Sequence, residues 1–220
     1  PGHYQEGGDE KLKITVIQPL TTNMERIINM TNEAESDLVI WPEAVTKFDK
    51  TVSKLVPKKV VIGGFFRQEN TNVYTSAINL KTGHHYDKRN LVPFGEFQPF
   101  GSLLKSINNF FNIPNSSLSR GSFYQTKADW SALICWELVF NETFTRRVRG
   151  TKYIVHMSNV KWYGSSMPAQ HLKHAKARAV ESNKWVVRAT LDGISQIISP
   201  RSNESSVILE RGEMGRITHE

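Results

Sequence analysis

The sequence predicts a layered α/β domain. Short β-branched, apolar runs alternate along the chain with segments of helical periodicity, and turns rich in Gly and Pro separate them. The chain has 220 residues, of which 39% are hydrophobic and 22% are charged, and this is sufficient for one sizeable buried core. Strands that alternate with helices, with some hairpins among them, are typical of sheets covered by helices.

Each expected element rests on a local signal. Residues 13–18 alternate and are β-branched, and 37–41 form a short apolar run that ends at a proline. Apolar positions three and four apart favour a helix at 22–35, and an early proline followed by alanines favours another at 168–183. In chain order, we expect strands at 13–18, 37–41, 58–66, 74–80, 84–87, 132–135, 153–157, 185–190 and 195–199, and helices at 22–35, 141–148 and 168–183.

Glycines mark two of the expected irregularities. The third strand should break at the pair Gly63-Gly64, because glycine weakens a strand interior. A turn at Gly83 predicts that 74–80 and 84–87 form a hairpin.

Composition excludes several functional classes. The formal net charge is +7, but the Lys and Arg residues are scattered and no nucleic-acid motif is present, so we expect no nucleic-acid partner. The positive charge suits a weak attraction to anionic lipid headgroups. No run approaches the length of about 18 apolar residues that a membrane span needs. We interpret residues 1–10, which are polar and Gly-rich, as a linker or an expression remnant, and 11–220 as a single domain.

The only cysteine, Cys135, is the first candidate for chemistry. It ends an apolar run and is followed by Trp136 and Glu137. A thiol is mostly protonated at neutral pH and needs a base to become a nucleophile. Glu43, at the end of another apolar run, is the candidate base, since burial at a strand end would raise the pKa of its carboxyl.

Lys88 supplies the third part of a covalent site. Its ammonium can stabilise the oxyanion of a tetrahedral intermediate, together with the backbone N–H of Trp136. Glu96 and Glu137 are further carboxylates that can orient Lys88 or support the surroundings of the thiol. A base, an ammonium and a thiol together suffice for covalent acyl transfer.

A hydrophobic arm follows at about 97–113. Its apolar residues recur at three- and four-residue steps, as on one face of a helix. Both an ordinary core helix and an arm that enters a lipid interface fit this pattern. In the second interpretation, the residues that contact membrane or substrate are Phe97, Phe100, Leu104, Phe110 and Phe111.

Histidines offer two alternatives. His171 and His174 share a helix face, but no third ligand of suitable spacing accompanies them, so we expect no metal and no cofactor. A papain-like pair of Cys135 with His156 or His171 is also open, although the local signature of that family is lacking.

Several ordered motifs resemble those of the nitrilase (carbon–nitrogen hydrolase) superfamily and, within it, the catalytic domain of the apolipoprotein N-acyltransferase family. The run Tyr-x-Lys-x-x-Leu-Val-Pro-Phe-Gly-Glu at 86–96 looks like that family's lysine motif. Residues 158–164 resemble its Asn-Asp-Ala-Trp-Phe-Gly segment, and 170–181 look like the helix that follows. Residues 188–195 are similar to its Arg-Ala-Thr-Asn-x-Gly-Ile-Ser strand, and the likeness covers about 13–200.

This resemblance implies a four-layer αββα sandwich of the nitrilase type. It also implies Glu43 as general base, Lys88 as oxyanion stabiliser and Cys135 as nucleophile. By the same matching, Glu96 and Glu137 would be supporting carboxylates.

The resemblance also implies substrates and a location. In that family the thiolate takes an acyl chain from a phospholipid as a thioester, and the α-amino group of a lipoprotein's diacylglyceryl-cysteine receives it. This implies a phospholipid acyl donor, a lipoprotein or other amine acceptor, and work at a membrane surface, on the periplasmic face of the bacterial inner membrane. The family's enzymes carry membrane helices around this domain, and this chain contains none.

Two other functions are compatible with the same motifs. The first is a soluble amidase of the superfamily, in which water resolves the acyl-enzyme. The second is a non-catalytic assembly domain that has kept the site residues without a productive pocket.

Overall fold

The computed structural model describes residues 13–93, 95–96, 118–161, 164, 166–201 and 207–219. In chain order its elements are β1 (Ile14–Gln18), α1 (Met24–Asn32), β2 (Leu38–Ile40), β3 (Thr46–Lys47), α2 (Val52–Leu55), β4 (Val60–Glu69), β5 (Asn72–Asn79), β6 (His85–Asp87), β7 (Trp130–Ile134), the 3₁₀ helix η2 (Cys135–Val139), α4 (Asn141–Val148), β8 (Tyr153–Asn159), α5 (Met167–Ser182), β9 (Val186–Leu191), β10 (Ser195–Ile198), β11 (Ile208–Leu209) and β12 (Gly215–His219).

The described strands form two sheets. The first has seven strands in the order β12-β1-β2-β4-β5-β6, with β3 paired to β4. The second has five strands in the order β11-β10-β9-β8-β7. Parallel pairing joins β1 to β2 and β2 to β4 in the first sheet, and β7 to β8 and β8 to β9 in the second. As a result β6 and β7 are edge strands of different sheets, and both lead directly into candidate site residues.

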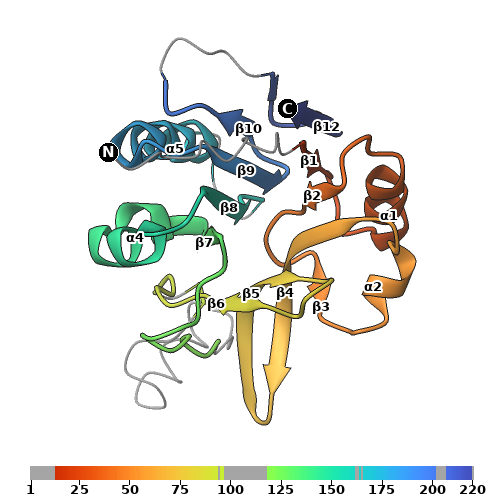
Figure 1. Cartoon of the computed structure of the whole chain (residues 1–220), viewed down its shortest axis with the longest axis horizontal. Helices are drawn as coiled ribbons and strands as arrows, with labels where there is room; N and C mark the ends of the chain where they lie inside the picture. Colours follow the sequence, from red (N-terminus) through yellow and green to blue (C-terminus); the bar gives the residue numbers. More distant parts are fainter. Residues whose placement is uncertain are drawn as a thin grey trace, which may run out of the picture.

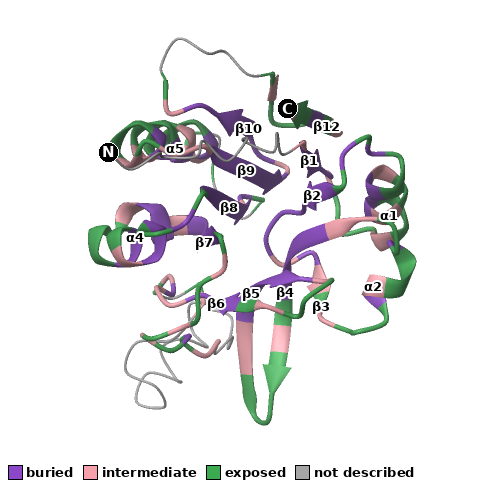
Figure 2. Ribbon diagram, in the orientation of Figure 1, coloured by how far each residue is buried: buried purple, intermediate pink, exposed green. Residues whose placement is uncertain are grey.

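The sheets lie face to face, and helices cover the outer face of each (Figure 1). In this view α4 and α5 lie on the left, α1 and α2 on the right, and the strands between them. Buried side chains follow the same layering, since the middle of both sheets is buried while the far end of the β4–β5 hairpin is exposed (Figure 2).

Three apolar clusters correspond to the three interfaces between these four layers. Val16 and Ile40 of the first sheet meet Val155 and Val187 of the second in the central cluster. The neighbouring residues in each strand point the other way, as the two-residue period of a strand requires. The outer clusters contain Ile17, Ile27, Val39, Trp41, Val61 and Phe65 on the α1 side, and Leu133, Phe144, Ile154, Ala175, Ala179 and Val186 on the α4–α5 side.

Local signals explain the two longest helices. The Asn23 side chain caps α1 by accepting a hydrogen bond from the backbone N–H of Arg26 at 3.0 Å. Helix α5 has Pro168 at its start, where proline costs no hydrogen bond, and ends at Asn183 in the left-handed conformation.

The expected four-layer αββα sandwich is confirmed. The three predicted helices and nine predicted strands all form, and the predicted hairpin of β5 with β6 is antiparallel. Five short described elements escaped prediction, namely β3, α2, η2, β11 and β12, because two to five residues carry too little periodicity.

The predicted break at Gly63-Gly64 is wrong. Strand β4 runs straight through both glycines, and both stay paired to β5. The glycines are there for another reason: a Cβ on Gly64 would lie 2.6 Å from the Cα of Glu43 and 2.9 Å from the backbone nitrogen of Ala44. Glycine thus lets the chain that carries Glu43 cross closely over the sheet.

None of the helices in the described part of the chain is long and apolar enough to cross a membrane. The arm expected at 97–113 lies outside the described residues.

Candidate active site

Three strand ends bring the candidate residues together. Glu43 follows β2, Lys88 follows β6, and Cys135 follows β7. The first two strands belong to one sheet and the third to the other, so the site forms where the two sheets meet. All three side chains are buried.

Lys88 is enclosed between two carboxylates. Its Nζ donates hydrogen bonds to Oε1 of Glu43 at 3.1 Å and to Oε1 of Glu96 at 2.6 Å, and its side chain is 0% exposed. Burial lowers the pKa of Lys88, but the charges of Glu43, Cys135 and Glu96 raise it more, so the ammonium stays protonated. An ammonium has three donors, and these two contacts leave the third for a substrate oxygen.

Glu43 is held at both of its oxygens. Oε1 accepts from Lys88, and Oε2 accepts from the backbone N–H of Asn159, at the end of β8, at 2.9 Å. Burial raises the pKa of this carboxyl, and the ammonium of Lys88 opposes that shift. A carboxyl whose pKa is raised while it remains beside a cation suits a general base.

Cys135 has a strained backbone. Its φ angle is +54°, in the left-handed region that a non-glycine residue adopts rarely and at a cost of about 1–3 kcal/mol. This conformation turns the chain sharply from β7 into η2. Burial and the charge of Glu43 raise the pKa of the thiol to about 12, while Lys88 acts in the opposite direction. The resting nucleophile is therefore a thiol, and it must give up its proton as it attacks.

Glu96 and Glu137 have different tasks. Glu96 joins the central cluster, with Oε1 on Lys88 and Oε2 accepting from the backbone N–H of Val92 at 2.8 Å. Glu137 lies behind it: its Oε1 accepts from the Tyr86 hydroxyl at 2.8 Å and from the backbone N–H of Arg89 at 2.8 Å.

Glu137 links residues next to the nucleophile with residues next to Lys88. Its Oε2 accepts from the backbone N–H of Ile134 at 3.0 Å, and its Oε1 also accepts from that of Asn90 at 3.0 Å. Burial raises the pKa of Glu137, and these hydrogen bonds to the charged form oppose the shift. One fully buried carboxylate thus fixes the residues that flank both Cys135 and Lys88.

The histidines do not form a papain-like pair with Cys135. His156 Nε2 lies 3.0 Å from the carbonyl oxygen of Cys135, and Nδ1 of His171 lies 3.5 Å from Oγ of Ser158. Burial lowers the pKa of both imidazoles, that of His171 to about 3, so both rings are neutral. Within the described residues, no three His, Cys, Asp or Glu side chains gather as a metal site would require.

Sequence reasoning assigned no role to several residues that shape this site. The backbone N–H of Asn159 and the missing side chain of Gly64 contribute only through where they lie in the fold. The type of residue at these positions gives no indication of that. Arg188 did have a signal, because a charged residue inside the apolar run Val-Val-Arg-Ala of a strand needs a reason to be there.

The Gly64 contact leads to a first prediction. Gly64→Ala should push the backbone of Glu43 and Ala44 away, lower the free energy of unfolding by about 1–3 kcal/mol and slow any reaction that needs the Glu43 carboxylate. Gly164→Ala is the matched control, because a Cβ added there would meet no atom of the described residues within 4 Å. Urea unfolding and thiol alkylation rates measure the two effects, and equal behaviour of the two variants would contradict the proposed close approach.

Known proteins share part of this sequence and this fold. The family model described as carbon–nitrogen hydrolase matches residues 58–214. The chain belongs to the carbon–nitrogen hydrolase family. Its fold is shared with the NitFhit protein of C. elegans, at a TM-score of 0.68 and 15% identity over 94% of this chain and 60% of that one. A carbon–nitrogen hydrolase superfamily protein from Xanthomonas campestris, XC1258, aligns with a TM-score of 0.63 at 15% identity, over 94% of this chain and 89% of that one.

Curated relatives of this chain carry a more specific name. An apolipoprotein N-acyltransferase of Vibrio parahaemolyticus is 31% identical over 86% of this chain and 43% of its own length. The enzyme of the same name from Pasteurella multocida is 38% identical over 68% of this chain and 28% of its own length. The resemblance to this group is thus confirmed, and the chain spans less than half the length of these relatives.

Proposed function

We propose that this chain is the catalytic domain of an acyltransferase that moves a fatty acyl chain from a phospholipid, through a Cys135 thioester, to the terminal amine of a lipoprotein. The observation that carries the proposal is the buried group of Lys88 held between Glu43 and Glu96 beside the only thiol. The relatives named apolipoprotein N-acyltransferase support this choice of substrates.

In the first half-reaction, the Cys135 sulfur attacks the ester carbon of the donor while Glu43 takes the thiol proton. The third N–H of Lys88 and the backbone N–H of Trp136 stabilise the oxyanion. The ester C–O bond then breaks, and Glu43 returns its proton to the departing alcohol. The products are the thioester and a lysophospholipid.

In the second half-reaction, the amine of the acceptor attacks the thioester carbon. Glu43 now takes a proton from the amine and returns it to the departing sulfur, so an amide forms and the thiol is restored. Because the donor leaves before the acceptor reacts, the kinetics should be ping-pong.

Intact-protein mass spectrometry tests the proposal. The protein is incubated with phospholipid in detergent, beside the Cys135→Ala variant. We expect a mass gain of one acyl chain that hydroxylamine reverses and that the variant lacks. Acylation by a short amide but not by phospholipid would replace the proposal with an amidase, and no acylation by either donor would indicate an assembly domain.

The proposed membrane contact has its own test. We propose that the arm with Phe97, Phe100, Leu104, Phe110 and Phe111 enters the lipid interface, on the strength of its apolar periodicity. Replacing Phe110 and Phe111 with serine should weaken co-sedimentation with liposomes by at least about tenfold, since each buried aromatic side chain contributes about 1.5–3 kcal/mol. An unchanged co-sedimentation with a lowered melting temperature would assign both rings to the protein core instead.

A further inference from the structure

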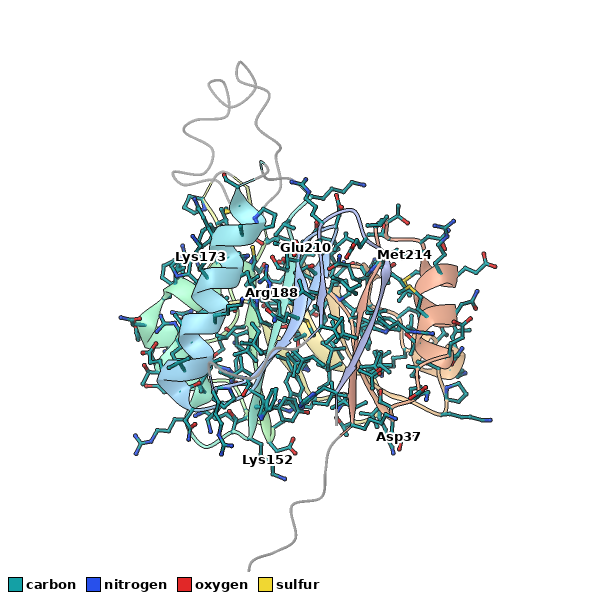
Figure 3. The ribbon with its side chains drawn as sticks, turned by 90° about the horizontal axis from the view of Figure 1, so that it is seen from above. Asp37, Lys152, Lys173, Arg188, Glu210 and Met214 are labelled. Atoms are coloured by element: carbon teal, nitrogen blue, oxygen red, sulfur yellow. The ribbon has the colours of Figure 1, made fainter. Side chains whose placement is uncertain are left out.

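A buried cation that the proposed reaction does not use lies behind the nucleophile. Arg188 of β9, a strand of the second sheet, is fully buried on the side that α5 covers (Figure 3). Its Nε donates to the carbonyl oxygen of Ile194 at 2.8 Å, and its Nη1 lies 2.7 Å from Nδ1 of His156. In the part of the chain that the structure describes, its Nη2 has no hydrogen-bond partner. Among the described residues, no carboxylate forms an ion pair with it.

Burying such a cation is unfavourable in free energy, because no opposite charge compensates for its lost hydration. Burial lowers the pKa of Arg188 to about 9, and the negative charge of a Cys135 thiolate raises it. The guanidinium is therefore still charged at neutral pH, and the anion that it favours is the nucleophile itself.

His156 connects this cation to the nucleophile. Its Cα pairs with that of Arg188 across β8 and β9, so the two side chains share the face that α5 covers. An arginine can only donate, so Nδ1 of His156 accepts and Nε2 carries the hydrogen. Nε2 therefore donates to the carbonyl oxygen of Cys135 at 3.0 Å.

The peptide group between Cys135 and Trp136 transmits this contact. A trans peptide is planar, so its C=O and N–H point in opposite directions. The structure contains no cis peptide bond among the described residues. A carbonyl held toward His156 consequently turns the N–H of Trp136 the other way, and the positive charge behind it strengthens that N–H as a donor.

We propose that Arg188 and His156 are positioning residues that hold the strained turn at Cys135, aim the Trp136 N–H at the oxyanion and favour the thiolate. The part of this inference that concerns the oxyanion rests on the proposed function, whereas the part that concerns the thiolate does not. The charged and titratable groups that face this part of the site are Glu43, Lys88, Glu96, Glu137, His171 and Arg188, and Ser158 contacts the thiol as well.

The test uses two substitutions that remove polar contacts with little change in volume, one that preserves those contacts, and one control. Arg188→Met removes the charge, and His156→Phe removes the donor. His156→Gln keeps both roles, since its amide oxygen can accept from Arg188 and its NH₂ can donate to Cys135. Val187→Ala, on the opposite face of β9, is the control for destabilisation alone.

The readouts are the pH dependence of Cys135 alkylation by iodoacetamide and the rate of acyl-enzyme formation. We expect Arg188→Met to slow Cys135 alkylation about tenfold at a fixed pH, which is the effect of raising the pKa of the thiol by about one unit. We expect His156→Phe to slow acylation by at least about tenfold, because the oxyanion donor is misaligned. His156→Gln should restore most of that rate, and Val187→Ala should lower the melting temperature without changing the alkylation rate of the folded protein.

Equal alkylation profiles in Arg188→Met and Val187→Ala, or a His156→Gln variant as slow as His156→Phe, would overturn the inference. If Arg188→Met does not fold, the comparison of His156→Phe with His156→Gln tests the inference on its own. If the wild-type protein forms no acyl-enzyme with phospholipid, the proposed function fails, while the alkylation rate of Arg188→Met still tests the support of the thiolate.

Discussion

Replacing Cys135 with alanine is expected to abolish the acyl-enzyme and to reduce acyl transfer by at least about 10⁴-fold. No other side chain can substitute, because the chain has a single cysteine and the thioester forms on its sulfur. The fold should survive, since alanine removes only one buried atom and the φ of +54° is equally strained for both residues. Mass spectrometry of the acyl-enzyme and the melting temperature measure the two parts.

Cys135→Ser is the matched control for this variant. Serine restores a side chain of nearly the same size with a much less acidic hydroxyl, so the variant should fold like wild type and still form no detectable acyl-enzyme. Acyl transfer that persists in Cys135→Ala would mean that another group, or a direct attack by the amine, carries the reaction.

Lys88→Met is expected to be the most destabilising single substitution in the site. Removing the ammonium leaves Glu43 and Glu96 facing each other without a counter-ion, and breaking a buried ion pair in this way costs about 3–5 kcal/mol. The variant should also be inactive, because it lacks the oxyanion stabiliser. Urea unfolding and the acyl-enzyme assay measure the two losses.

The stability loss in Lys88→Met should depend on pH with a defined sign. Without the ammonium, which lowers the pKa of Glu43, burial raises that pKa further above its value in the unfolded chain. A group whose pKa is raised on folding stabilises the protein below its unfolded pKa, and that contribution is lost as the pH rises. The difference between variant and wild type should therefore be smaller at pH 5 than at pH 8.

A double variant separates the two roles of Lys88. Lys88→Met with Glu96→Gln removes one of the stranded carboxylates and should recover part of the stability without any activity. A double variant as unstable as Lys88→Met would show that the loss comes from packing rather than from charge.

The alternation of strands and helices could be predicted because it has local signals, whereas the four-layer sandwich followed from the resemblance to the nitrilase superfamily. Apolar runs of four to seven residues identified the central strands. The three candidate residues that follow strands, Glu43, Lys88 and Cys135, lie together where the two sheets meet. Glu96 lies with them as expected, and the hydrogen bonds of Glu137 give it a supporting task.

Features that depend on long-range contacts could not be predicted. The role of Gly64 is visible only when the chain at Glu43 crosses over it, and local rules wrongly suggested a strand break. The pairing of β12 with β1 joins residues about 200 positions apart, beyond any periodicity. The histidines were open to a papain-like role until their hydrogen bonds to Cys135 and Ser158 assigned them elsewhere.

The division of the site between two sheets makes Cys135 a natural reporter of folding. Glu43 and Lys88 belong to one sheet and the thiol to the other. Before the two sheets pack together, the chain therefore exposes an ordinary thiol that alkylates readily. Once the sheets dock, the thiol is 3% exposed and its pKa is about 12. Pulse alkylation during refolding would thus time the docking of the sheets with no engineered probe, because the chain has no second cysteine.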